Sequence, residues 1–132
     1  MDNMVTAFVN GHERPLNYSV EVMFKVNDKF GGVKNVLAAV EGETRESAES
    51  MFWLLAELVN DGELCRRAAG MTPAEMISIE SISPRMKPFD YAVLKGQVIS
   101  AVNAGYRKET ESAEEVDLGL AELLEKKAPA GE

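Results

Sequence analysis

Residues 44–61 read TRESAESMFWLLAELVND, and this stretch carries the strongest helical pattern in the chain. Its apolar residues recur at the three- and four-residue spacings that place side chains on one face of a helix. They are Ala48, Met51, Phe52, Leu55, Leu58 and Val59, with Trp53, Leu54 and Ala56 widening the face. A helix that is apolar on most sides is usually central to a bundle. We therefore predict a central helix that ends at Asp61-Gly62, followed by a short helix over residues 63–69.

The segments on both sides of this helix also follow a helical period. We predict a helix from Ser19, a residue type that caps helix N-termini, to Gly31-Gly32, where glycine permits the left-handed conformation. A short helix is expected over residues 33–40, and a long one over residues 88–104. The predicted apolar face of the first of these helices consists of Val20, Met23, Phe24, Val26 and Phe30.

The N-terminal residues carry the pattern of a β-hairpin. Residues 4–9 are rich in β-branched and aromatic side chains, and Asn10-Gly11 follows them. That pair readily takes the positive φ angles of a two-residue hairpin turn. A second strand is expected over residues 13–16, at a sheet edge because Pro15 has no N–H to donate.

Two segments before the long helix are less regular. Thr72-Pro73-Ala74-Glu75 has the residue types of a capping box with proline at the first helical position, so it predicts a short helix. Residues 78–82 alternate isoleucine with polar residues before Ser83-Pro84, and the pattern leaves helix and extended strand open.

Together these elements predict a mainly α fold, a compact helical bundle with a short N-terminal β-hairpin. The length of 132 residues predicts one domain with one core. Within it we distinguish the hairpin (1–18), the helical body (19–106) and a region of polar linker, acidic amphipathic helix and frayed tail (107–132). The single cysteine excludes an intramolecular disulfide.

The negative charge is concentrated at the C-terminus. Residues 1–108 hold 14 acids and 12 bases, whereas residues 109–132 hold 8 acids and 2 bases. A nearly neutral body with an acidic tail gains little from contact with phosphates, so neither nucleic acid nor a membrane surface is an expected partner. The sequence shows no secretory signal or membrane span, and we expect a soluble intracellular protein.

Side chains suited to catalysis are few. His12 is the only histidine and falls at the predicted turn, where a solvated surface role is expected. Cys65 precedes Arg66-Arg67, which could lower the pKa of its thiol, but an inert thiol is expected because no second histidine is present to form a nucleophile–base pair. An enzyme would need paired acids such as Glu57 with Asp61, or Glu80 with Asp90. We predict no enzyme, no cofactor and no metal.

The predicted last helix, residues 113–127, carries an apolar stripe behind a polar linker. The stripe consists of Val116, Leu120, Leu123 and Leu124. One interpretation is that this helix packs back onto the bundle, and the other is that it docks onto another protein. We take the stripe as the candidate partner-binding site.

Three segments resemble the tail assembly chaperones of long-tailed bacteriophages and prophages, particularly those of Gram-positive hosts. PLNYSVEVMFKVNDKFGGVKNVL (15–37) resembles the first helical unit of that family. ESMFWLLAELVNDGELCRRAAG (49–70) resembles its Trp-containing helix and the turn after it. AVLKGQVISAVNAGYRKETESAEEVDLGLAELLEKK (92–127) is similar to its final long helix and acidic tail.

This resemblance implies a non-catalytic chaperone that binds the tape measure protein while tail tube subunits assemble around it. The tail tube protein is a second candidate partner, and homo-oligomer formation stays open. The resemblance also implies a location in the cytoplasm of the bacterial host and absence from the mature virion. The alternatives are a small acidic prophage interaction or inhibitor protein, and a minor structural component of the tail.

Overall fold

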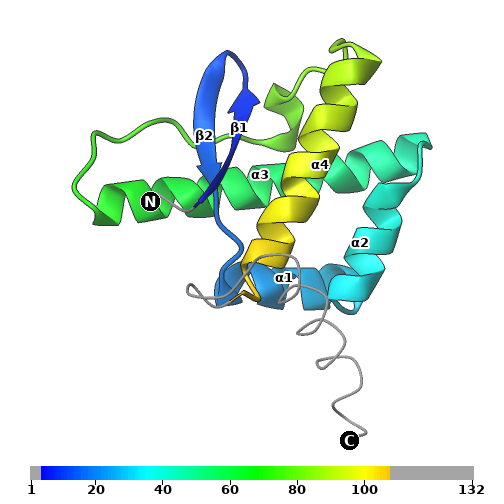
Figure 1. The fold of residues 1–132 in the computed structure, drawn as a ribbon, viewed down its shortest axis with the longest axis horizontal. Helices are drawn as coiled ribbons and strands as arrows, with labels where there is room; N and C mark the ends of the chain where they lie inside the picture. The colour runs from blue at the N-terminus through cyan, green and yellow to red at the C-terminus, as the bar shows by residue number, and fades with distance from the viewer. Residues whose placement is uncertain (1–3, 108–132) are drawn as a thin grey trace, which may run out of the picture.

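The computed structural model describes residues 4–107 and has the predicted mainly α fold with an N-terminal β-hairpin (Figure 1). In chain order its elements are β1 (Val5–Val9), β2 (His12–Leu16), α1 (Val20–Phe30), α2 (Val33–Glu41), α3 (Arg45–Ala68), the short 3₁₀ helix η1 (Ile79–Ser81) and α4 (Pro88–Ala104). The apolar pattern of residues 44–61 thus belongs to the longest of these elements, α3, with Thr44 as its N-cap.

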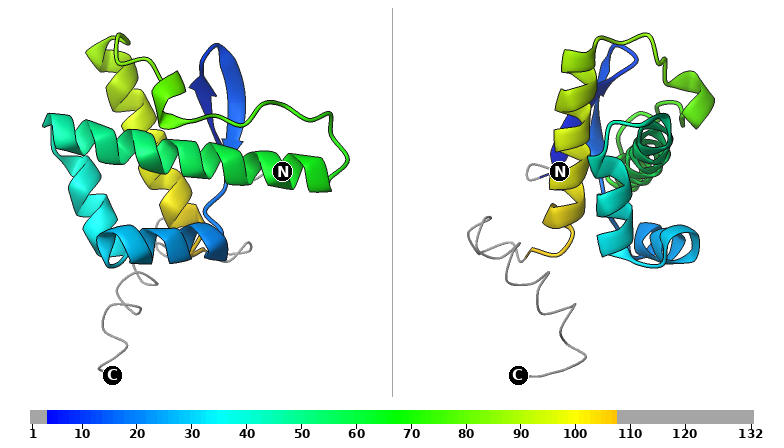
Figure 2. Two further views of the ribbon diagram at one scale, coloured as in Figure 1. Left: turned by 180° about the vertical axis from the view of Figure 1, so that it is seen from behind. Right: turned by 90° about the vertical axis from the view of Figure 1, so that its right-hand side faces the viewer.

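Helix α3 runs through the middle of the molecule, and the other elements pack around it (Figures 1 and 2). The hairpin and α4 cross α3 on the same side, with β2 against α3 and β1 against α4. Helices α1 and α2 pack against each other, and both contact α3. One continuous core results, and α3 supplies its largest fully buried side chains: Met51, Leu54, Leu55, Leu58 and Glu63.

The local sequence signals of the hairpin and of α1 are confirmed. Asn10 and Gly11 take φ angles of 52° and 86°, as the two-residue turn requires, and Val9 pairs with His12 across it. The side-chain oxygen of Ser19 accepts a hydrogen bond from the N–H of Val22 at 3.2 Å, so Ser19 caps α1. Gly31 ends the helix in the left-handed conformation.

The predicted stop at Asp61-Gly62 is wrong, because α3 continues without a break to Ala68. Gly62 is buried where α3 crosses β2, and a Cβ at this position would overlap the carbonyl oxygen of Pro15. The glycine therefore permits a close approach of helix and strand and does not end the helix. A contact between residues so far apart in sequence leaves no local signal.

The predicted apolar face of α1 is also partly wrong. Val26 is fully buried, as is its neighbour Val22 one turn earlier, which the prediction omitted. Val20 and Phe24 instead lie on the outer side of the helix, with exposed fractions of 63% and 52%. Helix α1 lies at the edge of the bundle and buries only a narrow face, so two large apolar side chains remain in solvent.

The predicted short helix at Thr72–Glu75 is absent, and this segment is extended. Side chains of α3 bind the backbone groups that a helix would have used. The N–H of Ile77 donates to Asn60 Oδ1 at 2.8 Å, and Asn60 Nδ2 donates to the carbonyl oxygen of Ile77 at 2.8 Å. The isoleucine segment left open by the sequence forms the single turn η1 and then an extended link to α4.

The end of α4 closes onto the connection between the hairpin and α1. The rings of Tyr18 and Tyr106 pack with centroids 5.6 Å apart, and their hydroxyl groups are 3.5 Å apart. Burial, followed by the hydrogen bond with Tyr106, raises the pKa of Tyr18 well above its ordinary value. The residues after α4 are thus fixed to the connection between β2 and α1.

Replacing Gly62 tests the close approach of α3 to β2. We expect Gly62→Ala to lower the free energy of unfolding by about 2 kcal/mol or more, because the new methyl group meets backbone that cannot move aside without shifting the hairpin. Glu49→Ala, at an exposed position of the same helix, is the matched control and should change stability by less than about 0.5 kcal/mol. Urea unfolding of both variants provides the measurement, and equal stabilities would contradict the close approach.

Candidate functional site

A buried carboxylate, Glu63, joins three parts of the fold. Its Oε1 lies 2.7 Å from Arg66 and 3.6 Å from Arg14 of β2. Its Oε2 lies 2.9 Å from Arg67 and accepts the backbone N–H of Ala74 at 2.7 Å. The side chain of Glu63 is completely buried, and that of Arg14 is nearly so. The hairpin, the central helix and the extended segment after it therefore meet at one carboxyl group.

The electrostatics of Glu63 follow from this set of donors. Burial by itself would raise the pKa of Glu63. The hydrogen bonds from the Ala74 N–H and from Arg66 and Arg67 outweigh burial and lower the pKa from its ordinary value of 4.5 to about 2. Glu63 is ionised at neutral pH, and both of its carboxylate oxygens are bound by donors. We assign it a structural role.

These contacts also define the role of Arg66-Arg67 beside Cys65. The sequence left open that this pair lowers the pKa of the Cys65 thiol, but both guanidinium groups bind Glu63. Burial, followed by the charge of Asp61, raises the pKa of the Cys65 thiol. The direction of this shift agrees with the inert thiol expected from the sequence, and Cys65 stays protonated at neutral pH.

The acids of the first pair weighed as catalytic, Glu57 and Asp61, are each bound by structural partners. Glu57 accepts a hydrogen bond from Lys25 at 3.1 Å, which raises the pKa of Lys25. Asp61 accepts hydrogen bonds from Asn17 at 2.9 Å and from Ser19 at 2.7 Å, so it secures the capping residue of α1. Both acids are therefore engaged in contacts that hold the fold together.

The remaining candidates are not brought into a common site. Glu80 and Asp90 are both exposed, and no hydrogen bond or ion pair joins them. His12 begins β2 and is exposed beside a hollow whose lining includes Glu13 and Arg14. Across residues 4–107, no group of three His, Cys, Asp or Glu side chains could hold a metal ion. None of the helices described there is long and apolar enough to cross a membrane.

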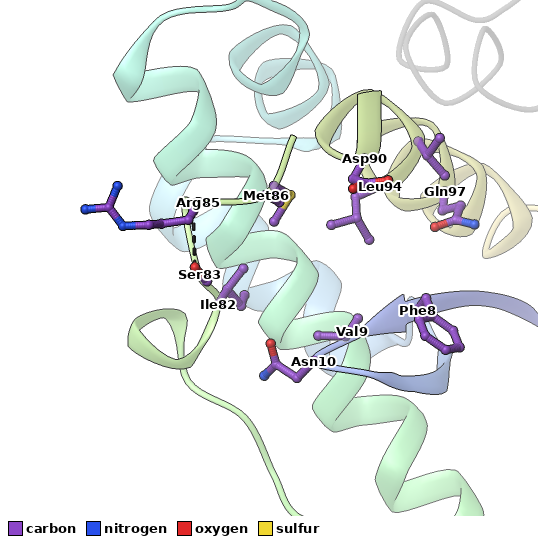
Figure 3. Close-up of a pocket in the computed structure, with 11 residues that line it drawn as sticks. Phe8, Val9, Asn10, Ile82, Ser83, Arg85, Met86, Asp90, Leu94 and Gln97 are labelled. Carbon is purple, nitrogen blue, oxygen red and sulfur yellow. Dashed lines mark hydrogen bonds between the residues drawn. The ribbon is translucent and has the colours of Figure 1, made fainter. Parts of the chain in front are cut away.

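A groove lies between the hairpin, the link after η1 and α4, and residues of all three segments line it (Figure 3). Its volume is about 490 Å³. Val9 of β1, Ile82 and Met86 of the link, and Leu94 of α4 form its apolar lining. Asn10, Arg85 and Asp90 supply polar groups at its margin. Met86 is unbranched and adaptable, which suits an apolar surface that accepts varied side chains.

Large apolar side chains beside this groove remain in solvent. Phe8 of β1 is 67% exposed, Phe89 of α4 is 74% exposed and Val93 of α4 is 42% exposed. Phe8 and Val93 line the groove, and Phe89 lies one helical turn before Val93. Exposed apolar side chains gathered at a hollow are typical of an interaction surface. We name this surface the α4 groove and define it by its lining residues Phe8, Met86, Val93 and Leu94, with Phe89 exposed one turn before Val93.

The predicted partner-binding stripe lies outside the described residues. Val116, Leu120, Leu123 and Leu124 therefore stay predictions. The α4 groove was not predicted from the sequence, because its residues come from three segments and several match a simple helical core pattern. The available signal was the apolar pair Phe89 and Val93, which lie one turn apart in the helix predicted over residues 88–104.

Comparison of the chain with protein-family models, with curated proteins and with solved structures finds no match.

Replacing Glu63 tests the buried carboxylate. Glu63→Gln should lower the free energy of unfolding by about 3 kcal/mol near neutral pH, because it leaves the buried Arg14 without its anion. Glu57→Gln is the matched control on the same helix. It removes only the partly exposed pair with Lys25 and should cost less than about 1 kcal/mol.

The same comparison has a defined pH dependence. The pKa of Glu63 is lower in the folded than in the unfolded chain, so its stabilisation is present above pH 4.5 and is lost as the pH falls towards 2. The difference in stability between wild type and Glu63→Gln should therefore shrink over that window. Urea unfolding at several pH values measures it, and a difference independent of pH would contradict the assignment.

Proposed function

We propose that this chain is a tail assembly chaperone of a long-tailed bacteriophage or prophage, which binds the tape measure protein and assists assembly of the tail tube without catalysing a reaction. The family and the client come from the resemblance of residues 15–37, 49–70 and 92–127 to such chaperones. The structural observation that supports a binding role is the α4 groove, where Phe8, Phe89 and Val93 are exposed beside an apolar hollow.

The shape and chemistry of the groove suit a helical client. An amphipathic helix binds in a groove by placing apolar side chains from successive turns into it. Leu94 and Met86 provide apolar walls, and Arg85 and Asp90 provide charges of both signs at the margin. A long helical client presents many such faces, so a shallow and adaptable groove suits it better than a deep specific pocket.

The charge distribution supports the same role. The acidic residues 109–132 add negative charge to a nearly neutral body. Net charge keeps a protein soluble, and it would do the same for a complex with an aggregation-prone client. One of the two acid pairs weighed as catalytic is consistent with a non-catalytic role, because Glu57 and Asp61 are engaged in contacts that hold the fold together.

The proposal places two surfaces in contact with the client. The α4 groove is the first. The stripe of Val116, Leu120, Leu123 and Leu124 is the second, on the strength of its sequence pattern alone. The cytoplasm of the bacterial host is the proposed location. Absence from the finished virion separates a chaperone from a minor structural component of the tail.

Co-expression with the tape measure protein encoded nearby tests the proposal. We expect the full chain to co-purify with the client and keep it soluble. Phe89→Glu with Val93→Glu should reduce co-purification at least about tenfold, which corresponds to about 1.4 kcal/mol of binding free energy. Phe24→Glu is the matched control, because Phe24 is an exposed aromatic residue of a different helix. It should leave binding unchanged.

Each other outcome has a defined meaning. No binding by the full chain would contradict the proposed function. Binding that survives the double substitution in α4 but is lost on Leu120→Glu with Leu124→Glu would move the client site to the stripe. Mass spectrometry of purified virions that finds the chain in stoichiometric amounts would favour a structural tail component.

A further inference from the structure

A second hollow in the described surface lies where the first turns of α3 and α4 meet the link after η1. Its volume is about 480 Å³, which is the size of pockets that hold small organic molecules. Met86 is the only residue that lines both this hollow and the α4 groove, so the two are separate features. We name the second hollow the Tyr91 pocket and define it by Arg45, Ala48, Phe52, Met86, Tyr91 and Lys95.

The walls of the Tyr91 pocket are apolar and belong to the packed part of the fold. Phe52 of α3 is a core residue, and Ala48, Met86 and Tyr91 pack against the core. The rings of Phe52 and Tyr91 meet edge to face, with centroids 6.1 Å apart and planes at 88°. These side chains are therefore already in place to contact the hydrocarbon part of a ligand.

The hydroxyl group of Tyr91 has an unused hydrogen-bonding capacity. Its oxygen atom is buried and has no hydrogen-bond partner among the residues that the structure describes. Burial, followed by the charge of Glu43, raises the pKa of Tyr91, so the hydroxyl keeps its proton at neutral pH. Buried hydroxyl groups are normally hydrogen-bonded, and an acceptor atom of a ligand in the pocket would supply the missing partner.

The charged groups of the pocket leave one positive charge in excess. Arg45, Lys95 and Glu43 all line it. Nζ of Lys95 donates to the backbone carbonyl oxygens of Glu41 at 3.0 Å and of Gly42 at 3.4 Å, which fix the ammonium group without neutralising it. Arg45 is exposed, and neither Arg45 nor Glu43 forms a hydrogen bond or ion pair in the part of the chain that the structure describes.

This combination of groups distinguishes between classes of ligand. A carboxylate can accept two parallel hydrogen bonds from the guanidinium group of Arg45 and a further one from the hydroxyl of Tyr91. A cationic ligand would be repelled by Arg45 and Lys95. A phosphate would bring a second negative charge close to Glu43. A singly charged carboxylate on an apolar carbon skeleton matches both the excess charge and the apolar walls.

We propose that the Tyr91 pocket binds an apolar carboxylate, which accepts hydrogen bonds from Tyr91 and Arg45 beside the ammonium group of Lys95 and places its hydrocarbon part between Phe52 and Met86. This site does not rest on the proposed chaperone function. Because Met86 also lines the α4 groove, a bound carboxylate contacts one wall of that groove as well.

An NMR titration of the full chain with phenylacetate tests the proposal, with the neutral phenylacetamide as the matched ligand. We expect phenylacetate to shift the methyl signals of Ala48 and Met86. It should bind at least about ten times more tightly than phenylacetamide, because the amide lacks the charge that Arg45 and Lys95 attract. Equal affinities of the two compounds, or no binding of phenylacetate, would overturn the proposal.

Substitutions place the ligand within the pocket. Tyr91→Phe and Arg45→Gln should each weaken the binding of phenylacetate about fivefold. Tyr91→Phe should leave the stability of the free protein unchanged or raise it, because the hydroxyl has no partner there. Arg85→Gln is the matched control, since Arg85 is exposed and lines the α4 groove instead. Loss of binding with Arg85→Gln, or unchanged binding with both other variants, would overturn the proposal.

A parallel titration distinguishes two sources of the same chemistry. Acetyl-glycyl-leucine carries an apolar side chain and a free carboxylate, as the C-terminus of a protein does. If it binds more tightly than phenylacetate, the ligand is a protein C-terminus, and if it binds more weakly, the ligand is a free acid. Either result supports the pocket. Since no client is present, failure of these titrations would leave the proposed chaperone function to be judged by co-purification.

Discussion

The buried carboxylate of Glu63 is the interaction on which the arrangement of this molecule depends. A carboxylate without partners in an apolar core costs several kcal/mol, so the fold must bring donors to it. Here the donors come from β2, from the next turn of α3 and from the backbone at Ala74. Few arrangements of hairpin, helix and returning chain satisfy all of them together. The carboxylate therefore selects among packings that hydrophobic burial alone would leave close in energy.

The contacts of Glu63 also determine the path of the chain between α3 and α4, and so the position of the α4 groove. Ala74 is held on Glu63 and Ile77 on Asn60, so the chain after α3 runs back along the helix in an extended form. This path delivers η1 and then Ile82 and Met86 to the start of α4. Those two side chains form a wall of the α4 groove. The groove proposed as a binding surface is thus positioned by a buried charge that lies outside it.

Local signals in the sequence predicted the elements whose ends depend on nearby residues. Asn10-Gly11, Ser19 and Gly31 determine conformations through their own φ angles or hydrogen bonds a few residues away. Where the prediction was wrong, a distant contact had overridden a local preference. Gly62 serves the approach of β2, and Thr72-Pro73 stays extended because α3 binds the backbone that follows it. The α4 groove was not predicted because it also depends on contacts between residues distant in sequence, namely on which face of α4 the hairpin leaves uncovered.

Amide hydrogen exchange along residues 71–78 tests most directly whether Glu63 and Asn60 hold the returning chain. The amides of Ala74 and Ile77 should exchange slowly, because each donates to a side chain of α3. The amides of Glu75 and Met76 should exchange fast, because they donate to no described residue. This alternation within an extended segment is the predicted result. Uniformly fast exchange across the segment would show that the carboxylate does not organise it, and would remove the physical basis for the groove.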